Sequence, residues 1–156
     1  MFGRSYGGLV EPYMVEDADV VLVMMASMVS TARFAANVMR EAGKKVGVLK
    51  IRSFRPFPRE RIREIMSGSK AKALVVLDRM NENALLDEVR SALYPLDNRP
   101  LVMGYIVGLN GRDVAPYNMI DLAEQGFAAI KRGSVLQDNT MYMVRTKEFY
   151  QEARRA

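Results

Sequence analysis

The sequence predicts an α/β domain with three layers, in which helices cover both faces of a mostly parallel sheet. Apolar, β-branched runs alternate four times with segments of helical periodicity. The run Val20–Met25 is apolar throughout, as expected for a strand that is buried on both faces. A chain of 156 residues is most simply one domain with a substantial core. Parallel strands joined through helices require right-handed crossovers.

Five strands are expected, over residues 9–15, 20–25, 46–51, 73–77 and 101–107. The first contains Pro12, which has no N–H to donate, so this strand should lie at an edge of the sheet.

Four helices are expected between and after these strands. Ser30 is a candidate N-cap for the first helix, which should end at Gly43. Pro58 should introduce the second, over residues 59–66, and Pro116 should open the fourth, which Gly133 closes. The inward apolar positions are Ala32, Ala35, Ala36 and Met39; Ile62, Ile65 and Met66; Leu85, Leu86, Val89 and Leu93; and Met119, Ile120, Ala123, Phe127 and Ile130.

The domain itself is predicted to span residues 9–133. Residues 1–8 are glycine-rich and are interpreted as a lead-in or linker. Residues 134–156 are more apolar than a free tail, so they should dock either on this domain or on a partner.

A strand-to-helix loop, Arg52 to Pro58, provides the first candidate site. Arg52 and Arg55 suit a phosphate or carboxylate ligand, or they pair with nearby acids to hold the loop. Phe57 lies between two prolines. Its ring needs cover, either from a partner or from this domain's own helix.

Two further loops should share that edge, because parallel strands present their carboxyl ends together. Asp78 and Arg79 lie at the carboxyl end of the fourth strand, directly after Leu77, where they form either a satisfied local pair or part of a site. The segment Gly108–Asp113 follows the fifth strand. Its glycines, Gly108 and Gly111, could cradle a phosphate, but Asn-Gly favours a tight turn with Arg112 and Asp113 as interface residues.

Four segments together resemble one known family. Ile-Arg-Ser-Phe-Arg-Pro-Phe-Pro at 51–58 is similar to a motif of the transketolase C-terminal-like domain in 2-oxoacid:ferredoxin oxidoreductases. The segments at 3–11, 75–79 and 108–113 agree in order and spacing with the same domain. Asn110 and Ala26 stand where that family usually has glycine, and residues 80–83 replace a glycine-rich loop.

The resemblance implies the α subunit of such an enzyme, with a five-stranded mixed sheet whose edge strand is antiparallel. For the whole complex it implies oxidative decarboxylation of a 2-oxoacid, with pyruvate favoured, to acyl-coenzyme A and reduced ferredoxin. It also implies thiamine diphosphate, Mg, iron–sulfur clusters and coenzyme A, and partner subunits that are thiamine-binding and ferredoxin-like.

Composition limits what this chain can do alone. It contains no cysteine and no histidine, which removes thiolate nucleophiles, cysteine-ligated clusters and the usual proton shuttle. We therefore expect no catalytic residue, no metal site and no cofactor within the chain, and an inactive isolated protein. Net charge is +5, but the basic residues are scattered, so no nucleic-acid partner is expected. The longest apolar run is too short to cross a membrane and no signal peptide is evident, so a cytoplasmic location is expected.

Two functions therefore remain open. The first is a non-catalytic structural and assembly domain of a 2-oxoacid:ferredoxin oxidoreductase. The second is a stand-alone small-ligand or nucleotide-binding α/β module, favoured by Arg52, Arg55, Arg79 and Arg112 on one sheet edge.

Overall fold

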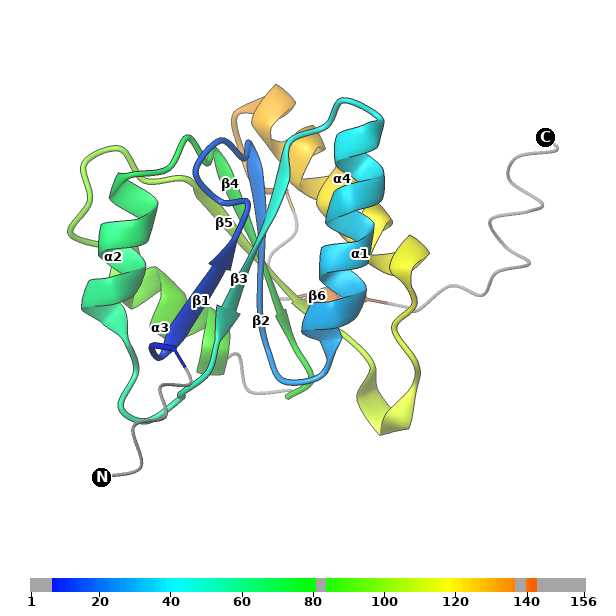
Figure 1. Cartoon of the computed structure of the whole chain (residues 1–156), viewed down its shortest axis with the longest axis horizontal. Coiled ribbons are helices and arrows are strands. Elements are labelled where there is room, and N and C mark those ends of the chain that lie inside the picture. Colours follow the sequence, from blue (N-terminus) through cyan, green and yellow to red (C-terminus); the bar gives the residue numbers. More distant parts are fainter. Residues whose placement is uncertain (1–6, 81–83, 137–139, 143–156) are drawn as a thin grey trace, which may run out of the picture.

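A six-stranded sheet forms the middle layer of the computed structural model, which describes residues 7–80, 84–136 and 140–142 (Figure 1). The strands are β1 (Val10–Tyr13), β2 (Val20–Met25), β3 (Val46–Ile51), β4 (Ala73–Asp78), β5 (Leu101–Ile106) and β6 (Thr140–Met141). Their order across the sheet is β1-β3-β2-β4-β5-β6. Only β1 is antiparallel to its neighbour among these strands, which confirms the predicted antiparallel edge strand.

Helices cover both faces of the sheet, as expected for strands this apolar. They are α1 (Met28–Glu41), α2 (Arg59–Ser67), α3 (Ala84–Leu93) and α4 (Pro116–Arg132). In Figure 1, α1 and α4 lie on one side of the sheet, and α2 and α3 lie on the other. The three-layer prediction is therefore confirmed.

Two cores result, one on each face of the sheet. Alternate residues of β2 point to opposite sides, so Val20 and Leu22 pack under α1 and α4, while Val21 and Val23 pack under α2 and α3. Close approach is needed at Gly126 on α4, where an added Cβ would lie 2.7 Å from Val20 Cγ1. Val20 of β2 therefore limits how closely α4 can pack against the sheet.

The prediction of five strands was wrong by one. Strand β6 comprises two residues, Thr140 and Met141, which pair in parallel with Tyr105 and Ile106 of β5. A two-residue strand has no alternating pattern from which to predict it. This part of the expected tail docks on the same domain, whereas residues 1–6, 81–83, 137–139 and 143–156 lie outside the described residues.

The beginning of α1 also differs from the prediction. The helix starts at Met28, so Ser30 lies in its first turn and donates from its hydroxyl to the Ser27 carbonyl oxygen at 3.3 Å. The preceding residue, Ala26, has a left-handed backbone with φ of 60°. The predicted cap, Ser30, therefore lies inside the helix, and Ser27 at its start makes no capping side-chain hydrogen bond. The predicted last helix is correct, with Pro116 at its start and Gly133 at its end.

Candidate functional site

The predicted site residues lie at the carboxyl edge of the sheet. Strands β3, β2, β4 and β5 run in parallel, with Met25 beside Ile51, Met24 beside Leu77, and Asp78 beside Ile106. The loops that begin at Arg52, Arg79 and Gly108 therefore leave the same edge. Because β2 lies between β3 and β4, the Arg52–Pro58 loop is separated from the other two loops.

Arg52 belongs to a group of charges that ties β1 to β3 and α1. Glu11 of β1 accepts hydrogen bonds from the guanidinium groups of Arg52 and Arg33, and Lys50 Nζ lies 3.8 Å away. The Arg52 backbone N–H also donates to the Leu9 carbonyl oxygen at 2.8 Å. Arg52 thus fixes the edge strand, which favours the structural alternative for this residue.

The arginines keep Glu11 ionised at low pH. Hydrogen bonds from Arg33 and then Arg52 lower the pKa of Glu11 from 4.5 to about 2. A folded-state pKa below the unfolded one stabilises the domain above pH 4.5, and the stabilisation is lost as the pH falls toward 2.

Arg55 also has an acidic partner within the domain. Its Nη1 lies 2.9 Å from Glu88 Oε1, and its guanidinium stacks 4.3 Å from the centre of the Phe54 ring. Arg59, in the first turn of α2, pairs with the second oxygen of Glu88. Glu88 on α3 is therefore shared by two arginines and joins α2 to α3.

Phe57 is part of this domain's own core, which is the second of the two covers expected for its ring. The ring exposes 9% of its surface and packs with Val10, Ile51 and Ile62 under the sheet. It also meets Phe54 edge to face, with ring centres 6.2 Å apart. The prolines on either side turn the chain inward, which supplies the cover that the ring needs.

Asp78 organises the start of α3. Its carboxylate accepts hydrogen bonds from the backbone N–H of Met80 at 3.1 Å and of Leu85 at 3.4 Å. Its carbonyl oxygen accepts from Val107 N–H at 2.8 Å. These bonds give Asp78 a local structural role and do not pair it with Arg79.

The segment after β5 forms a compact left-handed turn. Gly108, Asn110 and Gly111 have φ values of 65°, 58° and 75°, and residues Leu109–Gly111 make one turn of 3₁₀ helix. Asparagine tolerates this backbone better than other residues with a side chain, so Asn110 is an acceptable substitute for glycine. The turn supports the tight-turn interpretation of this loop. Arg79 lies close by, because a Cβ on Gly108 would be 3.4 Å from Arg79 Nε.

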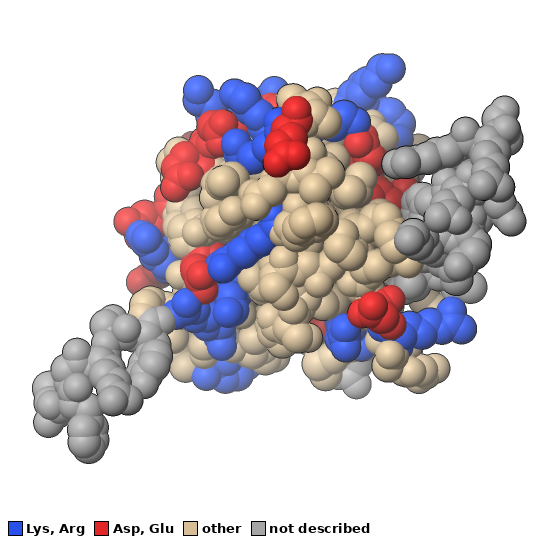
Figure 2. All heavy atoms as spheres, turned by 45° about the vertical axis from the view of Figure 1, so that its right-hand side comes forward, with Lys and Arg blue, Asp and Glu red and all other residues tan. Residues whose placement is uncertain are grey.

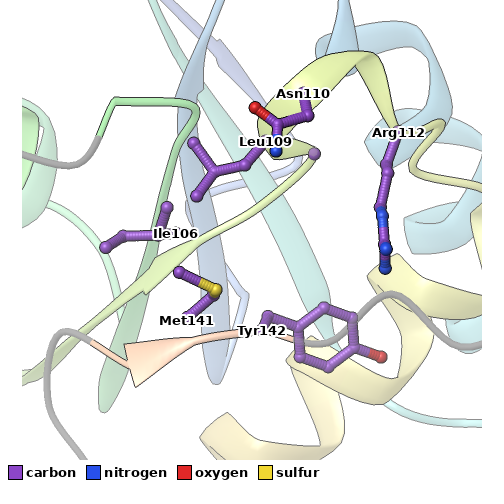
Figure 3. Close-up of a pocket in the computed structure, with 7 residues that line it drawn as sticks. Ile106, Leu109, Asn110, Arg112, Met141 and Tyr142 are labelled. Atoms are coloured by element: carbon purple, nitrogen blue, oxygen red, sulfur yellow. The ribbon is translucent and has the colours of Figure 1, made fainter.

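A small hollow of about 180 Å³ lies between this turn and β6. Ile106, Leu109 and Met141 line it with apolar surface, and Arg112 extends along one side toward the Tyr142 ring (Figure 3). The Tyr142 hydroxyl donates to Asp121 Oδ2 at 2.6 Å, which anchors the segment after β6 to α4. The sequence had indicated apolar docking by the tail, but not where this hollow would lie.

The candidate residues therefore fall into two separate groups. Arg52 and Arg55 are held by Glu11 and Glu88 on the β1 side. Arg79 and Arg112 border the Gly108 turn on the β5 side, where both are exposed. The four arginines do not converge on one anion, which disfavours a nucleotide-binding module.

The sequence contains no cysteine and no histidine, so this chain offers no thiolate to an iron–sulfur cluster. In the described part of the chain, no group of three or more acidic side chains is arranged to hold a metal ion. Over those same residues, no helix is both long and apolar enough to cross a membrane.

Comparison with solved structures identifies the fold. The fold matches a split-gene transketolase, an inactive β4 tetramer, over 76% of this chain and 41% of that one, with a TM-score of 0.58. It also matches the 2-oxoglutarate:ferredoxin oxidoreductase of Magnetococcus marinus over 78% of this chain and 20% of that one, with a TM-score of 0.60. Identity is 17% in both cases. This is a transketolase C-terminal-like domain in fold.

Sequence comparison then gives the family. Residues 18–119 match the family described as pyruvate:ferredoxin oxidoreductase core domain II, so the chain belongs to that family. It is 40% identical to the pyruvate synthase subunit PorA of Thermotoga maritima over 91% of this chain. It is 38% identical to the ketoisovalerate oxidoreductase subunit VorA of Pyrococcus abyssi over 90% of this chain. In both cases it spans 36% of the relative's length.

Proposed function

We propose that this chain is a non-catalytic structural domain of a 2-oxoacid:ferredoxin oxidoreductase. The observation that carries the proposal is the match to core domain II over residues 18–119, together with relatives that are named as oxidoreductase subunits. The lack of cysteine and histidine supports a role outside the chemistry. Its pairing of Arg52 with Glu11 and Arg55 with Glu88 supports the same view, since these cations hold loops.

For the whole enzyme, we infer oxidative decarboxylation of a 2-oxoacid to an acyl-coenzyme A with reduction of ferredoxin. Thiamine diphosphate with Mg and the iron–sulfur clusters would be held by other domains or subunits, which are this chain's partners in the cytoplasm. Pyruvate is our preferred substrate because the matching family and PorA carry its name, while VorA makes ketoisovalerate the alternative.

Within that enzyme, we propose that the β5 side of the carboxyl edge faces neighbouring domains. Arg79, Arg112 and Asp113 are exposed there beside the hollow. Arginine at such a border suits the carboxylates of a partner. Phe57 takes no part in this contact, because its ring is buried in the domain itself.

Co-purification tests the proposal. The tagged chain is expressed in its native cells, and the proteins that elute with it are identified by mass spectrometry and assayed for 2-oxoacid-dependent reduction of ferredoxin. We expect thiamine-binding and ferredoxin-like subunits and activity in the complex, but no activity in the isolated chain. Micromolar binding of thiamine diphosphate and Mg²⁺ to the isolated chain, measured by calorimetry, would overturn the proposal.

A further inference from the structure

The outer face of α1 carries few charged residues and exposes two apolar side chains. Phe34 exposes 59% of its surface, and Val38, one helical turn later, exposes 37%. The other outward positions between Ser27 and Val38 are mainly hydroxyl or amide residues, such as Thr31 and Asn37. Contact with water does not stabilise an apolar ring that is exposed to this extent, so the ring is suited to burial against another protein.

The opposite side of the domain has a different character. Five of the nine residues in α2 are charged, against three of the 14 in α1. Figure 2 shows a broad area free of Lys, Arg, Asp and Glu on the side that carries α1 and α4, with charged side chains at its borders. The lower share of charged residues on the α1 side is typical of the centre of an interface, and the higher share in α2 is typical of a solvated face.

An excess of positive charge lies at the border of this apolar area. Arg33 precedes Phe34 on α1, and its guanidinium lies 5.1 Å from the centre of the Tyr13 ring. The Tyr13 hydroxyl donates to Asn37 Oδ1 at 2.9 Å. This bond joins β1 to α1 beside both the charged group and the apolar area. Glu11 is the acid that Arg33, Lys50 and Arg52 share.

We propose that the outer face of α1, centred on Phe34 and Val38, is the main surface by which this domain packs against the rest of the oxidoreductase. This chain spans only 36% of the length of its relatives, so most of such a subunit has to be accommodated around it. The occupant is an uncharged protein surface in that remainder, with a carboxylate at its border opposite Arg33, Lys50 and Arg52. This inference rests on the proposed function and assigns its contact surface.

A binding experiment with a matched control tests the assignment. The oxidoreductase subunits that co-purify with the chain are isolated, and their affinity for the tagged chain is measured at low and high salt. The double variant Phe34→Ser/Val38→Asn should raise the dissociation constant at least about tenfold. Tyr94→Ser removes a ring that is 76% exposed, beside the end of α3 on the other side of the sheet, and should leave affinity unchanged. Binding of the unaltered chain should weaken as salt rises, because the border contact is ionic.

Thermal melting separates docking from folding. Both variants should melt within about 2 °C of the unaltered chain, because the replaced side chains are exposed. Equal affinity of the double variant and the Tyr94→Ser control would overturn the assignment while leaving the proposed function intact. Self-association of the isolated chain that the double variant abolishes would also overturn it, since the occupant would then be a second copy. If the unaltered chain binds no oxidoreductase subunit, the proposed function itself fails.

Discussion

Replacing Phe57 by alanine should strongly destabilise the isolated domain. The ring is nine-tenths buried among Val10, Ile51 and Ile62 and makes an edge-to-face contact with Phe54. Truncation of a buried phenylalanine costs about 3–5 kcal/mol. A hollow of about 450 Å³ borders the ring on its open side, so water can enter the space that alanine leaves. We therefore expect a loss at the lower end of this range, about 3 kcal/mol.

Urea denaturation at 25 °C, followed by circular dichroism, measures the change. Phe34→Ala is the matched control, because the same atoms are removed from a site that is 59% exposed. The control should change the free energy of unfolding by less than about 0.5 kcal/mol. A domain of this size has a stability of about 5–15 kcal/mol, so the Phe57 variant should still fold. A loss below about 1 kcal/mol for Phe57→Ala would show that its ring is not part of the core.

Three further predictions use the same assay. Gly126→Ala should destabilise the domain by about 1 kcal/mol, because the clash of the new Cβ with Val20 outweighs the better helix propensity of alanine. A gain in stability would contradict the close packing of α4 on β2. Glu11→Gln should cost about 1 kcal/mol at pH 7, since solvent screens a pair that is about one third exposed. That difference should shrink below pH 4.5 and vanish near pH 2, and a difference independent of pH would exclude the low pKa of Glu11. Ala26→Gly should stabilise the domain by about 0.5 kcal/mol, because relief of a left-handed φ of 60° at an exposed position outweighs the greater freedom of glycine in the unfolded chain. A loss of stability would contradict the left-handed backbone at this position.

The central elements of the fold could be predicted because each carries its own pattern. Strands such as Val46–Ile51 are short apolar runs, and Pro12 marks an edge strand by its missing N–H. The two-residue β6 has no such pattern and depends on the edge that β5 offers. The start of α1 depends on the backbone of Ala26, which adjacent sequence does not reveal.

The position of the candidate site could also be predicted, because strand direction determines which loops share an edge. The partners of its side chains could not. Glu11 is 41 positions from Arg52, and Glu88 is 29 positions from Arg59, so neither pair leaves a local signal. The sequence allowed the Phe57 ring to be buried either by a partner or by this domain. Only the three-dimensional path of the chain after Pro56 shows that it lies in the domain's own core. The roles of Arg79, Gly108, Gly111, Arg112 and Asp113 at an interface remain predictions.

The antiparallel strand β1 has a practical consequence for defining the unit that folds. The family match begins at residue 18 and ends at residue 119, whereas β1 covers Val10–Tyr13 and α4 continues to Arg132. A fragment cut at the matched residues would leave the backbone of β3 without its outer neighbour and remove Glu11 from the three cations around it. An uncovered strand of this kind is a template for aggregation. Any autonomous version of this domain should therefore begin before Leu9, whose carbonyl oxygen still accepts from Arg52.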